Sequence, residues 1–109
     1  MENNEKTKKK EGAFEIPKES VDRYHFLRWD AIRSTKGRRE RLIKLEKAMK
    51  LGNTTHDKVK IYFKTVDEQV LSIEGTVWAV GTSGGDSYVS LKGGKTIPVK
   101  SIIDVEFEV

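Results

Sequence analysis

The sequence predicts an α+β fold in which one or more N-terminal helices pack on a small five-stranded antiparallel β-barrel. Apolar and polar residues alternate along Val59–Phe63, Leu71–Val77 and Ile103–Val109, which is the pattern of half-buried strands. Glycine-rich turns separate short strands within residues 58–109, an arrangement typical of a small barrel. Residues 36–51 repeat apolar side chains at helical spacing.

Length and composition favour one folded domain. The chain has 109 residues, of which 35% are charged and 36% hydrophobic, and this suits a small core under a heavily charged surface. We expect residues 1–12 to form a disordered basic tail, because they contain one apolar side chain. The domain then covers residues 13–109, with a helical segment at 18–51 and the barrel at 58–109.

The chain contains no cysteine, which excludes a disulfide framework and a thiolate metal site. It also has no apolar run long enough to span a membrane, and the first residues are charged where a secretory signal would be apolar. These features predict a cytoplasmic protein without a membrane-spanning segment.

The stretch from Phe14 to Arg33 mixes helical spacing with aromatic residues. Pro17 and Ser20 suit the entrance of a helix, whereas Phe26 and Trp29 lie off its apolar stripe. Two interpretations remain open for these rings. They fill one end of the barrel core, or they lie exposed beside the neighbouring arginines, where they would stack on nucleic-acid bases.

The clearest helix is predicted over 36–51, with Ser34 or Thr35 as its N-cap and Gly52 or Asn53 at its end. Its predicted apolar stripe consists of Leu42, Leu45, Ala48 and Met49. The basic residues that a helical wheel places away from this stripe are Arg39, Lys44, Lys47 and Lys50. They form either a phosphate-binding surface or an ordinary solvated face.

Five strands are predicted after this helix. In the first, over 58–65, we expect Val59, Ile61 and Phe63 to point inward. The others are predicted over 70–81, with a bend at Gly75, and over 88–91, 96–99 and 103–107, with one helical turn at 99–102.

Charge is unevenly distributed along the chain. Residues 1–60 carry 17 Lys and Arg against 10 Asp and Glu, whereas residues 61–109 carry 4 against 7. The first part is therefore strongly basic and the second mildly acidic. This asymmetry favours contact with a polyanion through the basic part.

No motif predicts enzyme chemistry, a metal or a cofactor. The run Gly94-Lys95-Thr96 lacks the earlier glycine of a phosphate-binding loop, since Val89 occupies that position, and it precedes no helix. His25 and His56 lie in different elements and have no cysteine or histidine partner for a metal site or a catalytic pair.

The order of the predicted elements, together with the run 94–105, resembles SH3-like and Sm-like small β-barrels. An Sm-like protein implies a ring that holds RNA bases. The Asp, Asn and Arg-Gly residues of that family have no counterpart in 80–86 or 92–95, so its RNA site is not transferred to this chain. The C-terminal pattern also resembles YolD-like bacterial proteins, whose N-terminal motif is faintly echoed by 25–29.

These observations predict a small non-enzymatic binding module for RNA or DNA. The candidate nucleic-acid-binding residues are Arg28, Trp29, Arg33, Arg39, Lys44, Lys47 and Lys50. The alternative is a protein–protein interaction module that binds an acidic partner or pairs with itself through an edge strand of the barrel, and it is favoured by the exposed Trp78 side of the second strand and by short strands with unpaired edges.

Overall fold

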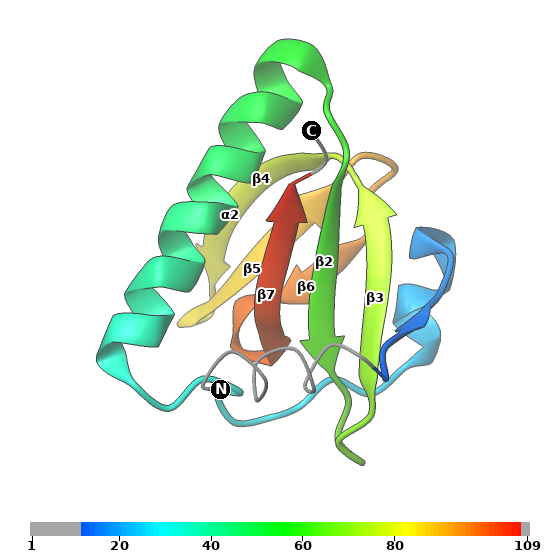
Figure 1. The fold of residues 1–109 in the computed structure, drawn as a ribbon, viewed down its shortest axis with the longest axis vertical. Coiled ribbons are helices and arrows are strands. Elements are labelled where there is room, and N and C mark those ends of the chain that lie inside the picture. Colours follow the sequence, from blue (N-terminus) through cyan, green and yellow to red (C-terminus); the bar gives the residue numbers. More distant parts are fainter. Residues whose placement is uncertain (1–11, 108–109) are drawn as a thin grey trace.

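The computed structural model describes residues 12–107, which form one α-helix, two short 3₁₀ helices and seven strands in two sheets (Figure 1). The α+β class is as predicted, but the predicted five-stranded barrel is wrong, because neither sheet closes on itself. Nearly all of the predicted tail at 1–12 lies outside the described residues.

The strands are divided between a four-stranded and a three-stranded sheet. The first sheet has the order β1 (Phe14–Glu15), β3 (Val70–Gly75), β2 (Val59–Lys64) and β7 (Ile102–Phe107). The second has the order β4 (Val77–Ser83), β5 (Asp86–Leu91) and β6 (Thr96–Pro98). Neighbouring strands are antiparallel except for β1 and β3, which run parallel.

The barrel prediction fails at the strand predicted over 70–81. The chain bends near Gly75 as expected, but β3 ends there and β4 begins at Val77 in the other sheet. At the other edges of the two sheets, β4 and β7 would have to pair to close a barrel. The long helix α2 instead contacts both of these strands (Figure 1). Side-chain packing of α2 therefore holds the two sheets together at this side.

The helix α2 (Thr35–Thr55) begins as predicted and ends later than predicted. The Ser34 hydroxyl caps its start by accepting a hydrogen bond from the Gly37 amide at 3.0 Å. Gly52 does not end the helix. It lies where α2 crosses β4, so closely that a Cβ at this position would overlap the carbonyl oxygen of Val77. His56, in the left-handed conformation with a φ of 59°, follows the last helical residue.

The helix is turned relative to the predicted apolar stripe. Leu45 and Ala48 are buried as predicted, but Leu42 is 44% exposed and Arg41 is buried in its place. Arg41, Leu45, Ala48 and Gly52 follow the spacing of one helix face, and this is the face that packs on the sheets.

The predicted helical segment at 18–51 is helical at both ends but is interrupted between them. A 3₁₀ helix, η1 (Lys18–Arg23), is followed by a loop at 24–34 that contains only a single bridge between Phe26 and Thr65. The reason is tertiary: the Leu27 amide donates to the Lys64 carbonyl, and the Val66 amide to that of His25, which draws this stretch along the end of β2.

The core lies between the sheets and under α2. Val59, Ile61 and Phe63 point into it as predicted, and Val89 and Ile97 enter it from the three-stranded sheet. A 3₁₀ turn, η2 (Val99–Ser101), precedes β7 at the predicted place. No helix within residues 12–107 combines the length and apolar character needed to cross a lipid bilayer.

Candidate functional site

The loop at 24–34 is held in place by an ion pair at the start of α2. The Arg41 guanidinium donates to both carboxylate oxygens of Asp30, at 2.8 and 2.9 Å, and to the Ile102 carbonyl at 3.1 Å. The Ile32 amide donates to the same carboxylate at 2.8 Å, and the Arg38 Nε lies 3.3 Å from it. The Arg41 guanidinium of α2 therefore joins the helix to the loop through the Asp30 carboxylate and to β7 through the Ile102 carbonyl.

The environment of Asp30 favours its ionised form. Burial alone would raise the pKa of this carboxyl group. The hydrogen bonds from Arg41 and the Ile32 amide, together with the charges of Arg41 and Arg38, outweigh burial and lower the pKa below its usual value. The Arg41 side chain is only 5% exposed, so this pair connects the protein interior to the surface loop.

The anchored loop presents one aromatic ring and two arginines to solvent. Trp29, directly before Asp30, is 53% exposed, and Arg28 and Arg33 are exposed on either side. Phe26 instead packs against Phe63 in the core, with ring centroids 5.4 Å apart. The two interpretations of the aromatic residues thus apply to different rings, since Phe26 packs on the core and Trp29 lies at the surface.

The four basic residues predicted on α2 are in different surroundings. Arg39, Lys47 and Lys50 are exposed, and the Lys47 ammonium lies 4.7 Å from the centre of the Phe107 ring. Lys44 lies beside β7, where its Nζ is 2.7 Å from an Asp104 carboxylate oxygen. Its charge is therefore already paired within the protein.

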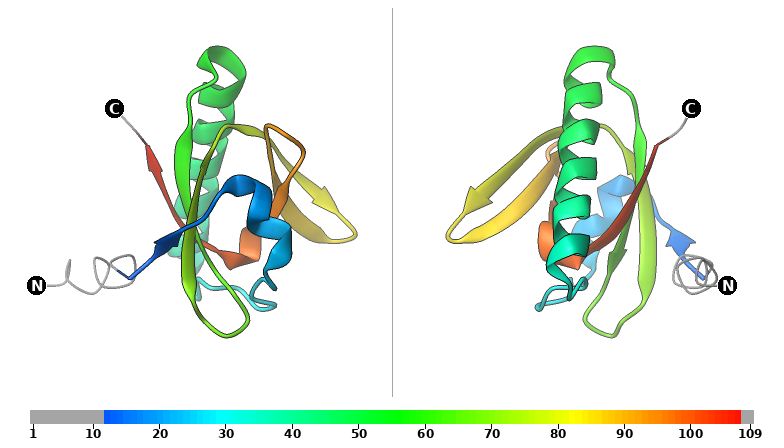
Figure 2. Two further views of the ribbon diagram at one scale, coloured as in Figure 1. Left: turned by 90° about the vertical axis from the view of Figure 1, so that its right-hand side faces the viewer. Right: turned by 60° about the vertical axis from the view of Figure 1, so that its left-hand side comes forward.

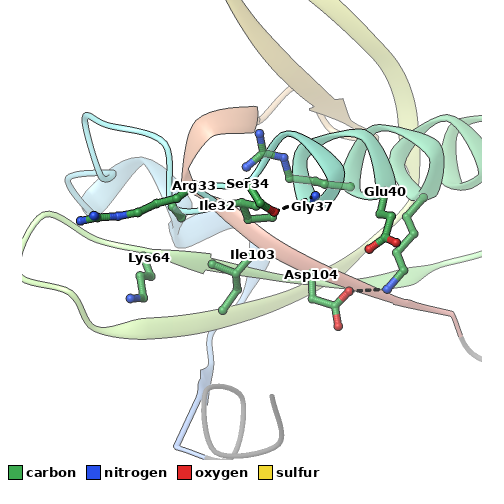
Figure 3. Close-up of a pocket in the computed structure, with 11 residues that line it drawn as sticks. Ile32, Arg33, Ser34, Gly37, Glu40, Lys64, Ile103 and Asp104 are labelled. Carbon is green, nitrogen blue, oxygen red and sulfur yellow. Dashed lines mark hydrogen bonds and ion pairs between the residues drawn. The ribbon is translucent and has the colours of Figure 1, made fainter. Parts of the chain in front are cut away.

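A groove of about 530 Å³ separates the first turns of α2 from β7 and the end of β2. Figure 3 shows Arg33 and Lys64 toward one end of the groove and Glu40 and Asp104 toward the other, with Ile32 and Ile103 between them. The remaining lining residues are Ala31, Ser34, Gly37, Arg41 and Lys44. One end is thus cationic, the middle is apolar, and the other end carries two carboxylates together with the Lys44 ammonium that pairs with Asp104.

The sequence prediction identified Arg33 and Lys44 of this groove but missed Lys64, Glu40 and Ile103. Residues of α2 and β7 meet here although more than fifty positions separate them in the chain. No local sequence pattern indicates that these residues are neighbours in the fold. A long-range contact between the helix and the last strand would have been the necessary signal.

Across residues 12–107, no three His, Cys, Asp or Glu side chains gather in a way that would hold a metal ion. Comparisons with protein-family models, curated proteins and solved structures found no match to this chain. The function is therefore inferred from the arrangement of the residues themselves, namely an exposed ring, exposed cations and a groove between α2 and β7.

Proposed function

We propose that this protein is a small non-enzymatic module that binds single-stranded RNA or DNA. The proposed binding surface, here called the cationic surface, consists of Trp29 with Arg28, Arg33, Arg39, Lys47 and Lys50. The observation that most supports it is the Trp29 ring, which is 53% exposed and has arginines nearby on both sides in the chain.

An exposed ring on an anchored loop suits base stacking. Stacking of a base on an aromatic side chain contributes about 1–3 kcal/mol and tolerates any base, because every base has a flat face. The bidentate contact between Asp30 and Arg41 fixes the residue next to Trp29, so less loop entropy is lost on binding.

The exposed cations of α2 would contact the phosphates. Arg39 and Lys50 are eleven positions apart, which corresponds to roughly 17 Å along a helix. A strand lying along α2 would therefore meet several cations at once. If each of the five cations of the cationic surface contacts one phosphate of a single strand, log affinity falls with log salt concentration with a slope of about −3.5.

The experiment is a fluorescence-anisotropy titration of labelled mixed-sequence DNA and RNA oligonucleotides at low salt. Trp29→Ala should weaken binding about 5- to 150-fold, the equivalent of one lost stacking contact. Trp78→Ala is the matched control, because Trp78 is also exposed, at 46%, but belongs to β4. Absence of binding at tens of micromolar protein would refute the proposal.

The contribution of α2 can be measured separately. Replacing Arg39, Lys47 and Lys50 together with Gln removes three exposed cations, which should flatten the salt slope by about 2. The thermal midpoint should change little, since these side chains are exposed. An unchanged salt slope would exclude α2 from the interface.

A second candidate function is supported by β4. α2 covers the start of this strand at Val77, but within residues 12–107 the strand pairs with β5 alone and its later residues are mostly exposed, Trp78 at 46%, so the edge beyond Val77 offers backbone groups to a protein partner. Light scattering over a range of concentrations tests self-pairing. A monomer throughout, with only nucleic acid recovered in pull-downs from native lysate, would count against this candidate.

The proposal includes a cytoplasmic location. The 109 residues contain no cysteine, so no disulfide bond could form in an oxidising compartment and stabilise the fold. Fractionation of cells that produce the natural protein tests this assignment. Recovery in a secreted or membrane fraction would contradict it.

A further inference from the structure

We infer that the groove between α2 and β7 holds one nucleotide of the bound strand and selects a base that carries an amino group. This inference rests on the proposed function and assigns a subsite to it. Arg33 belongs both to the cationic surface and to the groove lining, so a strand on that surface passes the mouth of the groove. The volume of about 530 Å³ lies in the range of small-ligand sites.

The cationic end of the groove suits a phosphate. Within residues 12–107, Arg33 has no ion-pair partner, and Lys64 has only Glu68, at 3.8 Å. The Glu68 side chain is 65% exposed, so this pair is weak and a phosphate can replace it. The Lys64 side chain is 24% exposed, so much of its aliphatic stem is already packed and less side-chain entropy is lost when the ammonium binds a phosphate.

The middle of the groove suits the flat face of a base. Ile32 at the end of the loop and Ile103 on β7 lie on opposite walls, and both are partly buried. Ala31 adds to the same apolar lining. A base placed there covers aliphatic surface that is otherwise in contact with water.

The other end suits an amino group. Glu40 is exposed and has no ion-pair partner among the described residues, whereas the nearby Asp104 is already paired with Lys44. A carboxylate accepts hydrogen bonds but cannot donate them, so it recognises the amino group of a base and repels a carbonyl group at the same position. Cytosine offers an amino group at the position where uracil has a carbonyl oxygen.

The test compares oligo-dC with oligo-dU of equal length, because the two bases differ only in this group and in the hydrogen on the adjacent ring nitrogen, which uracil carries and cytosine lacks. The intact protein should bind oligo-dC at least about 5-fold more tightly, the lower limit for one specific base contact. Glu40→Gln should bring the ratio close to one, because an amide can donate to uracil as well as accept from cytosine. Glu46→Gln is the matched control, since Glu46 is also exposed on α2 but does not line the groove.

The outcomes separate this inference from the proposed function. A preference for oligo-dC that Glu40→Gln abolishes and Glu46→Gln retains supports the groove as a base-selective subsite. Equal binding of both strands, or a preference that Glu40→Gln leaves intact, overturns the subsite and leaves the cationic surface in place. Absence of binding to either strand overturns both. Thermal melts of each variant show whether a change in binding reflects loss of the fold.

Discussion

Replacing Asp30 with Asn tests whether its carboxylate anchors the loop at 24–34 to α2 through Arg41. The substitution keeps the size of the side chain but removes the charge that faces Arg41. Arg41 is 5% exposed, so it would remain as a buried cation without its counter-ion. We therefore expect a marked loss of stability from a change of a few atoms.

The size of this loss follows from the contacts. Removing one partner of a buried ion pair costs about 3–5 kcal/mol. Asp30 is 16% exposed, and the Ile102 carbonyl would still accept a hydrogen bond from Arg41, so water and backbone compensate in part. The expected cost is about 3 kcal/mol, a large share of a total stability of about 5–15 kcal/mol.

Urea denaturation at several pH values is the appropriate assay. The pKa of Asp30 is lower in the folded state than its usual 3.8, so its stabilising contribution is complete above that value. The contribution is lost as the pH falls through the lower folded-state pKa. The difference in unfolding free energy between the original chain and Asp30→Asn should therefore be full at pH 7 and shrink below about pH 4.

Arg39→Ala and Arg41→Ala provide the matched comparison, since both remove an arginine from α2 but only Arg41 is buried. Arg39→Ala should cost less than about 0.5 kcal/mol. Equal costs for the two substitutions, or a cost of Asp30→Asn that is the same at pH 7 and pH 3, would refute the reasoning.

Two further stability predictions concern the packed face of α2. Leu45→Ala should cost about 2–5 kcal/mol, because Leu45 is fully buried, whereas Lys50→Ala should cost less than about 0.5 in the same urea melts. Gly52→Ala should destabilise by at least about 1–3 kcal/mol, because the added methyl group overlaps the Val77 carbonyl. Its control, Gly81→Ala, adds a methyl group into open space and should leave the thermal midpoint nearly unchanged. Equal losses within either pair would show that the packed face of α2 is wrongly assigned.

Local patterns predict much of the secondary structure because each depends on residues that are close in the chain. The start of α2 follows from the Ser34 side chain and an amide three positions later. The inward face of β2 follows from the alternation of Val59, Ile61 and Phe63. The exposure of Trp29 was one of two interpretations that the sequence left open.

The errors arise where distant residues meet. Leu42 is predicted on the packed stripe, but Arg41 is buried in its place because its partners are Asp30, eleven positions away, and the Ile102 carbonyl, 61 positions away. Gly52 is predicted to end the helix because glycine is common directly after a helix. Its actual role is the close contact with Val77, which depends on how the helix crosses β4 and is not visible in the local sequence. The groove was missed for the same reason, since Lys64 and Ile103 reach it only through the pairing of β2 with β7.

The hairpin of β4 and β5 has a consequence for changes in chain length. Figure 2 shows it projecting from the rest of the fold, and its two-residue turn consists of Gly84 and Gly85, with φ angles of 60° and 88°. Nothing lies within 4 Å of a Cβ built at either glycine. Since each doubling of a flexible loop costs only about 0.6 kcal/mol, an inserted peptide between these glycines should leave the fold intact. This turn is therefore the place to introduce an epitope or a fluorescent label that follows the protein in cells.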